Sequence, residues 1–528
     1  MPRTDLFRSV LRAWRVAAFA EAHQLRTTDA LERTAAPRRS RRDFLAAAGA
    51  AIAAVPAASV ARLSAASAPR IAIIGGGLAG LACADRLQTK GYSAVVYEAA
   101  ARLGGRCFSN RTLVPGMACE NGGELIDTGH KTMLAYANEF GLPLESYVKK
   151  RGAETYWFFG QAWSEAEIVD EFRQVVAGMQ DDLRAISGAA TFYANTAADR
   201  LFDQMTLADY FSTRCGGLPL VRAVLDEAYL AEFGLETSQQ SALNFLGFMR
   251  LNKQSKFEPF GSSDERFHIA TGNDGIVSGL AQKLRGPIVR HAALTRLGRA
   301  ASGEYRLYFN GSNTPETADA VVVTVPFSVL RTVQLDASLG LSADKRRAIN
   351  TLGYGANAKT MIAFDGRPWH ERHGASGGVY SDLANLQDCW ESNRGRSTSV
   401  GIITDYASGS RGAALRTNRV PQQVAAFLAD FDTALPGTAA RALRRNGAVV
   451  AHLEHWPSNP LSRGSYTCYT PGQFTGLAGL EAEAAGRLKF AGEHADSFYS
   501  WQGFMEGACL SGIRAANEIL ADIKTGGL

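Results

Sequence analysis

The sequence predicts an α/β fold, on the basis of three observations. The apolar, β-branched run Ile71–Ile74 leads directly into a glycine-rich turn. A helix-forming segment (81–90) and a second strand-like run (93–97) follow that turn. Near the other end of the chain, residues 488–520 again combine a strand-like run, a glycine turn and a long helical segment. This alternation of strands and helices is typical of a parallel sheet covered by helices.

Composition restricts the size of the protein and the kinds of partner it binds. A chain of 528 residues with 46% hydrophobic residues is large enough for two or more domains. No apolar run reaches the ~18 residues of a membrane-spanning helix, so we expect no integral membrane segment. Residues 1–68 hold 11 arginines and 5 acidic residues, which leaves 45 basic and 46 acidic residues in the body. This near-neutral body has no basic stripe, which argues against a nucleic-acid partner.

The cysteines give no sign of a disulfide framework or a metal site. The seven cysteines are scattered along the chain and form no C-x-x-C pair and no cluster with histidine. Zinc sites and disulfide-rich folds both require regular spacing of such residues. We therefore expect neither disulfides nor a bound metal.

The N-terminal region carries a candidate export signal. Residues 40–45, SRRDFL, place two arginines before an acidic residue, Phe and Leu, and an alanine-rich stretch follows. This segment resembles the bacterial twin-arginine signal, with Ala66–Ala68 as a small-residue cleavage site, although Pro69 is unfavourable for cleavage there. We expect export to the periplasm, with residues 1–68 as a leader that is either removed or retained. The alternative is an ordinary arginine-rich extension, because about 40 residues precede the motif.

A dinucleotide-binding site is predicted at the first glycine turn. Gly75, Gly77 and Gly80 form a G-x-G-x-x-G pattern between strand and helix, and the second strand ends at Glu98. The first glycine allows a tight turn, the second lets backbone N–H groups approach a pyrophosphate, and the third allows close helix–strand packing. The Glu98 carboxylate would accept hydrogen bonds from ribose hydroxyls and would repel a 2′-phosphate, which argues against NADP. NAD and FAD are both compatible with these residues.

Further motifs distinguish between the two dinucleotides. RLGGR (102–106) adds a second glycine pair and an arginine suited to phosphate contact. Together with LKFAGEHADSFYSWQGFMEGACLSGIRAANEIL (488–520), it resembles the flavin-containing amine oxidase family, which includes monoamine oxidases, polyamine oxidases and L-amino-acid oxidases. The resemblance covers about residues 70–525 and includes ENGGELID (120–127), IATGNDGIVSGLAQKL (269–284), ADAVVVTVPFSVL (318–330), GYGANAKTMIAF (353–364) and SRGSYTCYTPGQ (462–473).

The resemblance implies a monoamine-oxidase-like architecture with FAD as the cofactor. We expect a discontinuous, Rossmann-like FAD-binding domain (69–145, 266–329 and 466–528) with an inserted α+β substrate-binding domain (146–265 and 330–465). Ser465 stands where monoamine oxidases carry the cysteine that binds flavin covalently, so the FAD is expected to be non-covalent. The residues implied to bind FAD are Gly75, Gly77, Ala79, Gly80, Glu98, Arg106, Gly122, Gly123, Glu124, Leu294, Glu493, Phe504 and Met505.

The resemblance also implies three catalytic residues. Lys359 falls where the family places a lysine that reaches the N5 atom of the flavin through a water molecule. Tyr466 and Phe504 match the aromatic pair between which the amine is oriented, although Phe504 replaces the second tyrosine of monoamine oxidases. The helix that begins near Phe504 would direct its positive end at the flavin and make its reduction easier.

The expected reaction is the oxidation of a primary or secondary amine. Hydride transfer to FAD would give an imine that hydrolyses, and O2 would reoxidise the flavin with H2O2 as product. Venom L-amino-acid oxidases carry an arginine where this chain has Leu125, whereas Asp127 matches a carboxylate of plant polyamine oxidases. Asp127 is expected to bind substrate together with Tyr466, Phe504 and Trp501, which favours an amine and includes di- and polyamines. Asp127 could equally cap the helix that follows it.

Several alternatives stay open on the sequence alone. An L-amino-acid oxidase could bring its arginine from elsewhere in the substrate domain, and an amine dehydrogenase would pass its electrons to a periplasmic carrier. A flavoprotein with a structural or electron-relay role is disfavoured by the retained Lys359 and aromatic pair. A relative of phytoene desaturases or porphyrinogen oxidases fits the first motif but fits the closing motifs less well. Whether the protein is a monomer or a homodimer is also open.

Overall fold

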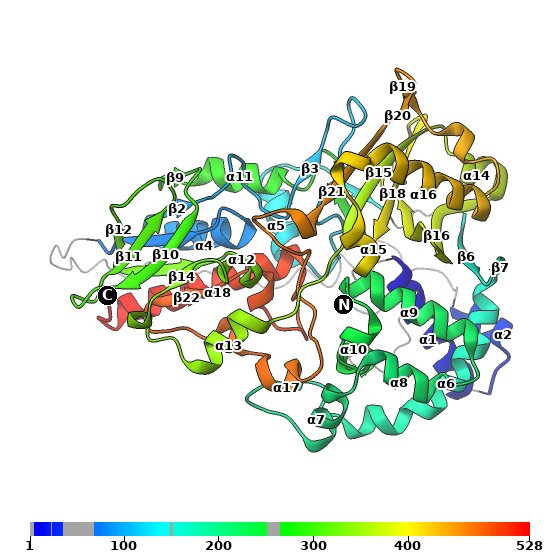
Figure 1. Cartoon of the computed structure of the whole chain (residues 1–528), viewed down its shortest axis with the longest axis horizontal. Coiled ribbons are helices and arrows are strands. Elements are labelled where there is room, and N and C mark those ends of the chain that lie inside the picture. Colours follow the sequence, from blue (N-terminus) through cyan, green and yellow to red (C-terminus); the bar gives the residue numbers. More distant parts are fainter. Residues whose placement is uncertain (1–4, 23, 35–67, 148–151, 251–263) are drawn as a thin grey trace, which may run out of the picture.

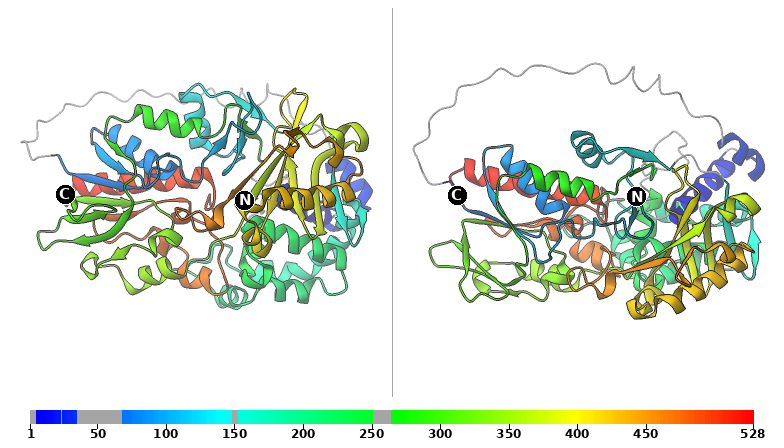
Figure 2. Two further views of the ribbon diagram at one scale, coloured as in Figure 1. Left: turned by 45° about the horizontal axis from the view of Figure 1, so that its top comes forward. Right: turned by 90° about the horizontal axis from the view of Figure 1, so that it is seen from above.

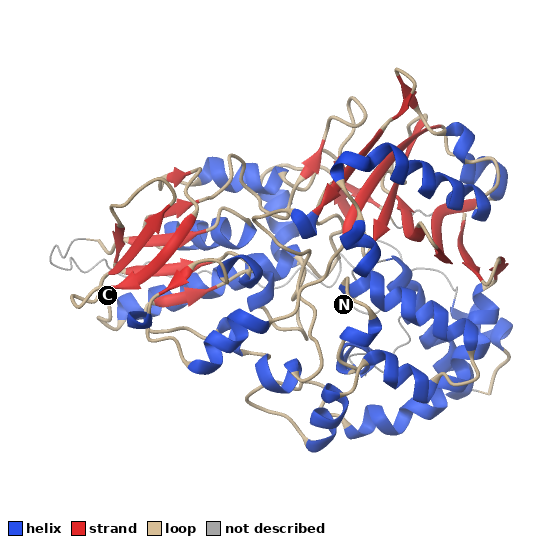
Figure 3. Ribbon diagram, viewed as in Figure 1, coloured by secondary structure: helices blue, strands red, loops and turns tan. Residues whose placement is uncertain are grey.

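The computed structural model describes residues 5–22, 24–34, 68–147, 152–250 and 264–528. A parallel sheet with its covering helices lies at one end of the molecule, and a larger sheet with a layer of helices lies at the other (Figure 1). Coloured by secondary structure, the strands gather in these two regions, and the helices surround them (Figure 3).

The parallel sheet has five strands in the order β22-β13-β1-β2-β9. Its centre is β1 (Ile71–Ile74), which pairs with β13 (Ala320–Val323) and β2 (Ala94–Tyr97); β22 (Leu488–Phe490) and β9 (Ile288–Val289) form the edges. Every residue of β1 and β13 is buried, as expected for parallel strands covered on both faces. The sheet brings the first and last motifs of the sequence together, and the predicted α/β fold is confirmed.

The helix after β1, α4 (Leu78–Gln88), begins three residues earlier than the sequence predicted. Gly77 is its N-cap, so Gly80 lies inside the first turn, where a Cβ atom would stand 2.0 Å from the Gly75 carbonyl oxygen. Gly80 therefore serves the close packing of helix on strand. The last helix, α18 (Met505–Lys524), packs along α4, and a Cβ on Gly512 would meet the Ala79 carbonyl oxygen at 2.1 Å (Figure 2).

The larger sheet has seven strands in the order β21-β15-β18-β17-β16-β6-β7. Its strand β15 (Ala358–Asp365) pairs antiparallel with β18 (Val400–Ala407) and β21 (Ala451–His455), and this register places Lys359 opposite Tyr406. The remaining strands are β17 (Leu386–Glu391), β16 (Ala375–Leu383), β6 (Ala153–Phe158) and β7 (Gln161–Trp163). Helix α16 (Val420–Ala434) packs on this sheet through an apolar core that contains Phe427 and Phe431.

A smaller sheet, β12-β11-β10-β14, lies beside the parallel one. Its strands are β10 (Leu294–Arg299), β11 (Tyr305–Phe309), β12 (Glu316–Ala318) and β14 (Gln334–Leu335). Because β14 pairs with β10, residues 334–335 lie in the same sheet as residues 294–299 of the predicted FAD-binding domain, although the sequence placed them beyond the boundary at 330. The pairing partner is distant in sequence, so local patterns could not set this boundary.

A layer of helices packs against the larger sheet through α9 (Pro219–Phe233). It also includes α6 (Glu165–Ala185), α7 (Ala197–Gln204), α8 (Leu207–Arg214) and α10 (Leu243–Arg250). Helix α1 (Asp5–Ala22) packs against α6 and α9, and α2 (Thr27–Thr34) packs against α6. Part of the segment interpreted as a leader is thus integral to this helical core. The SRRDFL motif itself lies outside the described residues.

The described part of the chain contains no group of His, Cys, Asp and Glu placed to hold a metal ion. All seven cysteines are buried and unpaired. Among the described helices, none combines the length and the apolar character needed to cross a bilayer.

Candidate active site

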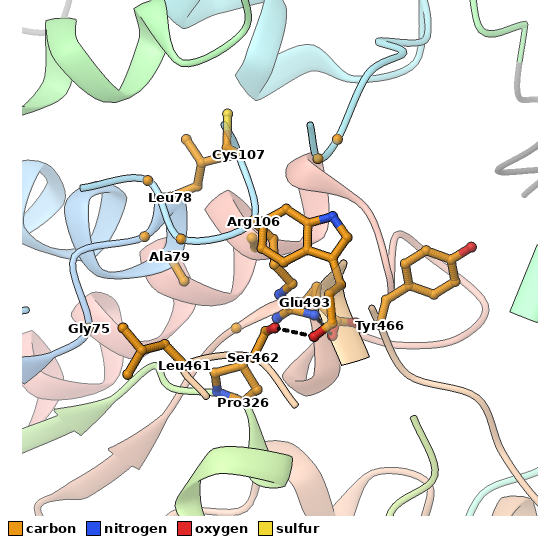
Figure 4. Close-up of a pocket in the computed structure, with 18 of the residues that line it drawn as sticks. Gly75, Leu78, Ala79, Arg106, Cys107, Pro326, Leu461, Ser462, Tyr466 and Glu493 are labelled. Carbon is orange, nitrogen blue, oxygen red and sulfur yellow. Dashed lines mark hydrogen bonds and ion pairs between the residues drawn. The ribbon is translucent and has the colours of Figure 1, made fainter. Parts of the chain in front are cut away.

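A cavity of about 500 Å³ is lined by residues of both large sheets. The turn between β1 and α4 forms one part of its wall, and β15, β17 and β18 contribute Lys359, Trp390 and Tyr406 to another part. In the close-up, Gly75, Leu78 and Ala79 lie on one side and Tyr466 on the other (Figure 4). Residues from the first and last motifs therefore meet those of the central motifs around one space.

The glycine turn leaves backbone N–H groups open to this cavity. Gly75 has a φ of +111°, which residues with a side chain rarely adopt, and it makes the tight turn out of β1. The nearest atom to a Cβ on Gly77 would be the Gly104 carbonyl oxygen, at 3.8 Å. Glu98 is buried against the turn and accepts hydrogen bonds from the backbone N–H groups of Gly76 and Ala100, both at 2.7 Å. The turn and its carboxylate are therefore fixed without any ligand.

Arg106 ties three segments of the wall together. Its guanidinium donates to the Glu493 carboxylate at 2.7 Å and to the Ser465 carbonyl oxygen at 2.7 Å, and Thr467 donates to the other Glu493 oxygen at 2.6 Å. Burial alone would raise the pKa of Glu493, but the charge of Arg106 and these hydrogen bonds hold it below its ordinary value. The segments that carry Arg106, Ser465 and Glu493 are thus held in one arrangement. Figure 4 shows Arg106 and Glu493 close together.

Two glycines let a loop pass between Arg106 and the start of α18. A Cβ on Gly122 would stand 1.8 Å from the Arg106 carbonyl oxygen, and a Cβ on Gly123 would meet the Met505 side chain at 2.9 Å. Phe504 is the N-cap of α18, and no side chain caps the helix there. Because Phe504 and Met505 also line the cavity, the positive end of α18 faces the same space.

Lys359 lies in the cavity wall as one member of a buried ion pair. Its Nζ atom is 2.7 Å from Glu124 Oε2 and also donates to the carbonyl oxygens of Gly122 (2.9 Å) and Glu120 (3.4 Å). Trp390 donates from Nε1 to the other Glu124 oxygen at 3.0 Å, and its ring lies 5.3 Å from the ammonium. Burial alone would raise the pKa of Glu124, but the charge and the hydrogen bond of Lys359 keep it below its ordinary value.

A second charged group lies behind this ion pair. The His268 ring is buried, with Nε2 2.8 Å from Glu120 Oε1 and Nδ1 3.9 Å from Glu145 Oε2. Burial alone would lower the pKa of His268, but these two carboxylates outweigh it and raise the pKa to about 9. At neutral pH the ring is therefore charged, and Lys359 and His268 both interact with the segment 120–124.

Aromatic side chains line the part of the cavity near Lys359. The Tyr466 and Tyr406 hydroxyls are 2.8 Å apart, and Tyr466 Oη also lies 3.4 Å from the Ala231 carbonyl oxygen. Phe504 lines the same cavity. Trp501 is not among the lining residues, and its ring packs on Phe504 and His130 with centroids 5.7 and 4.4 Å away.

Asp127 is buried beside this region and lines the cavity together with Glu265. Its Oδ1 atom accepts a hydrogen bond from the Glu265 backbone N–H at 2.7 Å. It does not cap the helix that follows, α5 (Lys131–Glu139), because the N–H groups of Thr132 and Met133 donate to Glu506 instead. Two carboxylate side chains thus border the cavity near the aromatic residues.

The model of the family described as "Flavin containing amine oxidoreductase" matches residues 78–520. The chain belongs to this family. Among curated proteins, it is 25% identical to YobN of Bacillus subtilis (strain 168), over 87% of this chain and 96% of YobN. It is 24% identical to the L-amino-acid oxidase of Siganus canaliculatus, over 85% of each chain.

Solved structures of two amine oxidases have the same fold. The cyclohexylamine oxidase from Brevibacterium oxydans IH-35A has a TM-score of 0.74 and 19% identity, and covers 87% of this chain and 100% of its own. A putrescine oxidase bound to putrescine has a TM-score of 0.71 and 19% identity, and covers 86% of this chain and 99% of its own. The predicted monoamine-oxidase-like architecture is confirmed.

The cofactor of this flavin-containing amine oxidoreductase is FAD, and the cavity fits it. The open backbone at Gly77 and the uncapped start of α4 suit the pyrophosphate, Glu98 suits a ribose, and the start of α18 suits an electron-rich ring. Of the residues predicted to bind FAD, Gly80 does not line the cavity. The other twelve line it: Gly75, Gly77, Ala79, Glu98, Arg106, Gly122, Gly123, Glu124, Leu294, Glu493, Phe504 and Met505.

Sequence reasoning missed several residues of the site. Trp390, Tyr406, Asn357 and Glu265 line the cavity and were not singled out. The position of Tyr406 follows only from the pairing of β15 with β18, which no local pattern reveals. A signal was present for Asn357 alone, because it stands two residues before Lys359 in the same motif.

Proposed function

We propose that this flavoenzyme oxidises a primary or secondary amine, including di- and polyamines, in preference to an α-amino acid. The observation that carries this proposal is the charge of the described cavity wall. Its three strong cations are Arg102, Arg106 and Lys359. Arg106 and Lys359 are paired with carboxylates, and the Arg102 guanidinium stacks 3.9 Å from the Phe108 ring centroid.

Two acidic side chains near the aromatic residues would favour a cationic tail on the substrate. Asp127 and Glu265 add carboxylates there, and Leu125 adds no charge. Nearby carboxylates stabilise an ammonium group and repel a substrate carboxylate. A diamine could therefore present one uncharged amine for oxidation and one ammonium to these side chains.

The protein side chains would bind and orient the amine. FAD, when bound, supplies the acceptor for the hydride and passes the electrons on. The Tyr466 hydroxyl, held by Tyr406, would present a fixed ring face to the amine, and Phe504 would supply a second aromatic wall. Lys359 would place its ammonium group in the wall, where Glu124 and the Gly122 carbonyl oxygen fix its position.

An anaerobic substrate panel tests this proposal. The purified holoenzyme would be mixed with a monoamine, a diamine and several L-amino acids while the flavin absorbance is followed. We expect amines to bleach the flavin at least ~10²-fold faster than L-amino acids. The reason is that the acidic side chains of the site attract an ammonium group and repel the carboxylate of an amino acid. Faster bleaching by an L-amino acid would overturn the amine assignment.

An L-amino-acid oxidase is the second candidate. Its support is the relative from Siganus canaliculatus, which carries that activity in its name and aligns over 85% of both chains. The same panel distinguishes the two candidates, since only this candidate expects an α-carboxylate to accelerate flavin reduction.

The electron acceptor and the destination of the protein are separate parts of the proposal. We infer that O2 reoxidises the flavin with release of H2O2; fast reduction combined with slow reoxidation in air would identify a dehydrogenase instead.

We also infer export, from the arginine pair Arg41 and Arg42. Substitution of both by lysine should retain the protein in the cytoplasm, as cell fractionation would show.

A further inference from the structure

The N-terminal helix α1 buries a continuous apolar face in the helical core. Six apolar residues of α1 are buried: Val10, Ala13, Trp14, Val16, Ala17 and Ala20. They share one apolar cluster with residues of α6 (Phe172, Val175 and Val176) and of α9 (Val221, Val224 and Leu225). The Trp14 and Phe172 rings meet edge to face, with centroids 5.9 Å apart. An amphipathic helix with such a face is stable only when the face is covered.

Polar contacts fix the position of this helix pair on α6. Arg12 pairs with Glu165 at 3.0 Å, and Glu21 pairs with Arg173 at 2.5 Å. In α2, the Thr27 hydroxyl donates to the Asp170 carboxylate. These contacts lie along one side of α6 and set the register of α1–α2 on the layer.

The helix α9, on which α1 packs, also supports the substrate end of the cavity. The carbonyl oxygen of Ala231, in its last turn, accepts from Asn357 Nδ2 at 3.0 Å and lies 3.4 Å from Tyr466 Oη. Its C-cap, Gly234, accepts from the Ala356 N–H at 2.8 Å. The end of α9 therefore positions the residue pair 356–357 just before Lys359, together with the tyrosine of the aromatic pair.

We propose that residues 5–34 are a permanent component of the substrate-binding region, which stays bound when the chain is cut between residues 35 and 67. The docking partner of the α6–α9 surface is this segment of the same chain, and it supports α9 and, through α9, the aromatic pocket. Removal of the segment would uncover the apolar surface of α6 and α9, which is unfavourable in a soluble protein. A dispensable leader is therefore confined to residues 35–68, and export would have to carry residues 5–34 across the membrane together with the body.

Cutting the folded holoenzyme tests the docking directly. A specific protease site would be placed at residue 50, the purified yellow protein would be cut, and the products would be passed over a sizing column without denaturant. We expect the N-terminal fragment to elute with the FAD-containing fragment. Separate elution of a body that keeps its FAD would overturn the proposal. Because the cut is made after folding, a folding failure cannot imitate either result, and neither result depends on the substrate.

Substitutions test the link to the pocket. Trp14→Ala should make the cut fragment dissociate. In the uncut enzyme it should raise KM about 3- to 10-fold, with kcat within about 2-fold and with unchanged FAD content, because the end of α9 accepts hydrogen bonds from Asn357 and Tyr466. Thr28→Ala, at an exposed position of α2, is the matched control and should change neither property. Equal KM in Trp14→Ala and Thr28→Ala would overturn the support of the pocket by α1. The KM readout rests on the proposed amine oxidation, whereas the elution readout does not, so the two failures are distinguishable.

Discussion

Lys359 and Glu124 form a buried ion pair in the wall of the cavity, with Nζ 2.7 Å from Oε2. The two residues lie 235 positions apart in the sequence, and the pair joins β15 of the larger sheet to the loop that passes beside α18. It therefore fixes a charge at the cavity and holds two parts of the molecule together. Both roles are testable.

Separate and joint substitution of the two residues should show strong coupling. Lys359→Met or Glu124→Gln alone leaves the buried charge of the other residue without an opposite charge. This should lower the free energy of unfolding by about 3–5 kcal/mol. The double variant should lose less than the sum of the two single variants, because no charge is left unpaired. Urea unfolding of the three holoenzyme variants measures this coupling. Additive losses would show that the two charges do not interact.

The lysine should matter more to flavin chemistry than to substrate binding. Lys359→Met should slow the reductive or oxidative half-reaction by at least ~10-fold, since a fixed charge in the wall of the FAD cavity would act on the transition state. KM should change less than kcat. Stopped-flow absorbance under anaerobic and aerobic conditions separates the two half-reactions, and unchanged rates in both would remove Lys359 from the catalytic residues.

The stability of the protein should fall at alkaline pH because of His268. Its pKa is raised to about 9, above the ordinary value of 6.5, so the charged ring contributes stability that is fully present below pH 6.5 and is lost as the pH rises through about 9. We expect a decrease of about 1–3 kcal/mol in the free energy of unfolding over this window. His268→Gln should remove this part of the pH dependence. Parallel pH profiles for the two proteins would contradict the assignment.

Two glycines of the first turn should respond differently to alanine. Gly80→Ala would place a Cβ 2.0 Å from a backbone oxygen and should destabilise the protein whether or not FAD is bound. A Cβ atom at Gly77 would have the Gly104 carbonyl oxygen as its nearest contact, at 3.8 Å, so in Gly77→Ala the fold should survive while FAD affinity falls by at least ~10-fold. Thermal unfolding of the apoprotein and flavin titration measure the two effects. Loss of the apoprotein fold in Gly77→Ala would argue against an open site there.

The flavin should be released on denaturation. Ser465 lines the cavity, and its hydroxyl donates to the Asn357 side chain. A seryl oxygen offers no thiolate for a thioether, and Cys468 is packed in the apolar core. Cys107 also lines the cavity, but burial raises the pKa of its thiol well above the ordinary value, which disfavours the thiolate. After acid precipitation, the yellow colour should be found in the supernatant. Colour that stays with the washed pellet would demonstrate a covalent bond.

The paired tyrosines should act together on substrate binding. Tyr466→Phe and Tyr406→Phe each remove one end of the 2.8 Å hydroxyl contact, and each should raise KM by about 3- to 10-fold. The double variant should be no worse than Tyr466→Phe, because removal of the Tyr466 hydroxyl already breaks the contact between the two tyrosines. Steady-state kinetics of the three variants decides this, and multiplicative effects on KM would mean that the hydroxyls act independently.

Local sequence patterns predicted the parts of this protein whose function depends on backbone shape. A G-x-G-x-x-G turn between an apolar strand and a helix needs glycine for steric reasons, and the structure has that turn at Gly75 and Gly77. The closing motif also placed the start of the last helix near Phe504, where the structure has its N-cap. Such features depend on a few neighbouring residues, so the sequence alone predicts them.

The tertiary structure alone decided which distant side chains share the cavity. Trp390 and Tyr406 reach it because β17 and β18 lie beside β15, and Glu124 finds Lys359 because two separate segments meet there. The docking of α1 on α6 and α9 likewise depends on apolar surface that is distant in the chain. The physical reason is that strand pairing and burial of apolar faces join residues without regard to their separation in sequence, whereas turns and helix starts are set by steric limits on neighbouring residues.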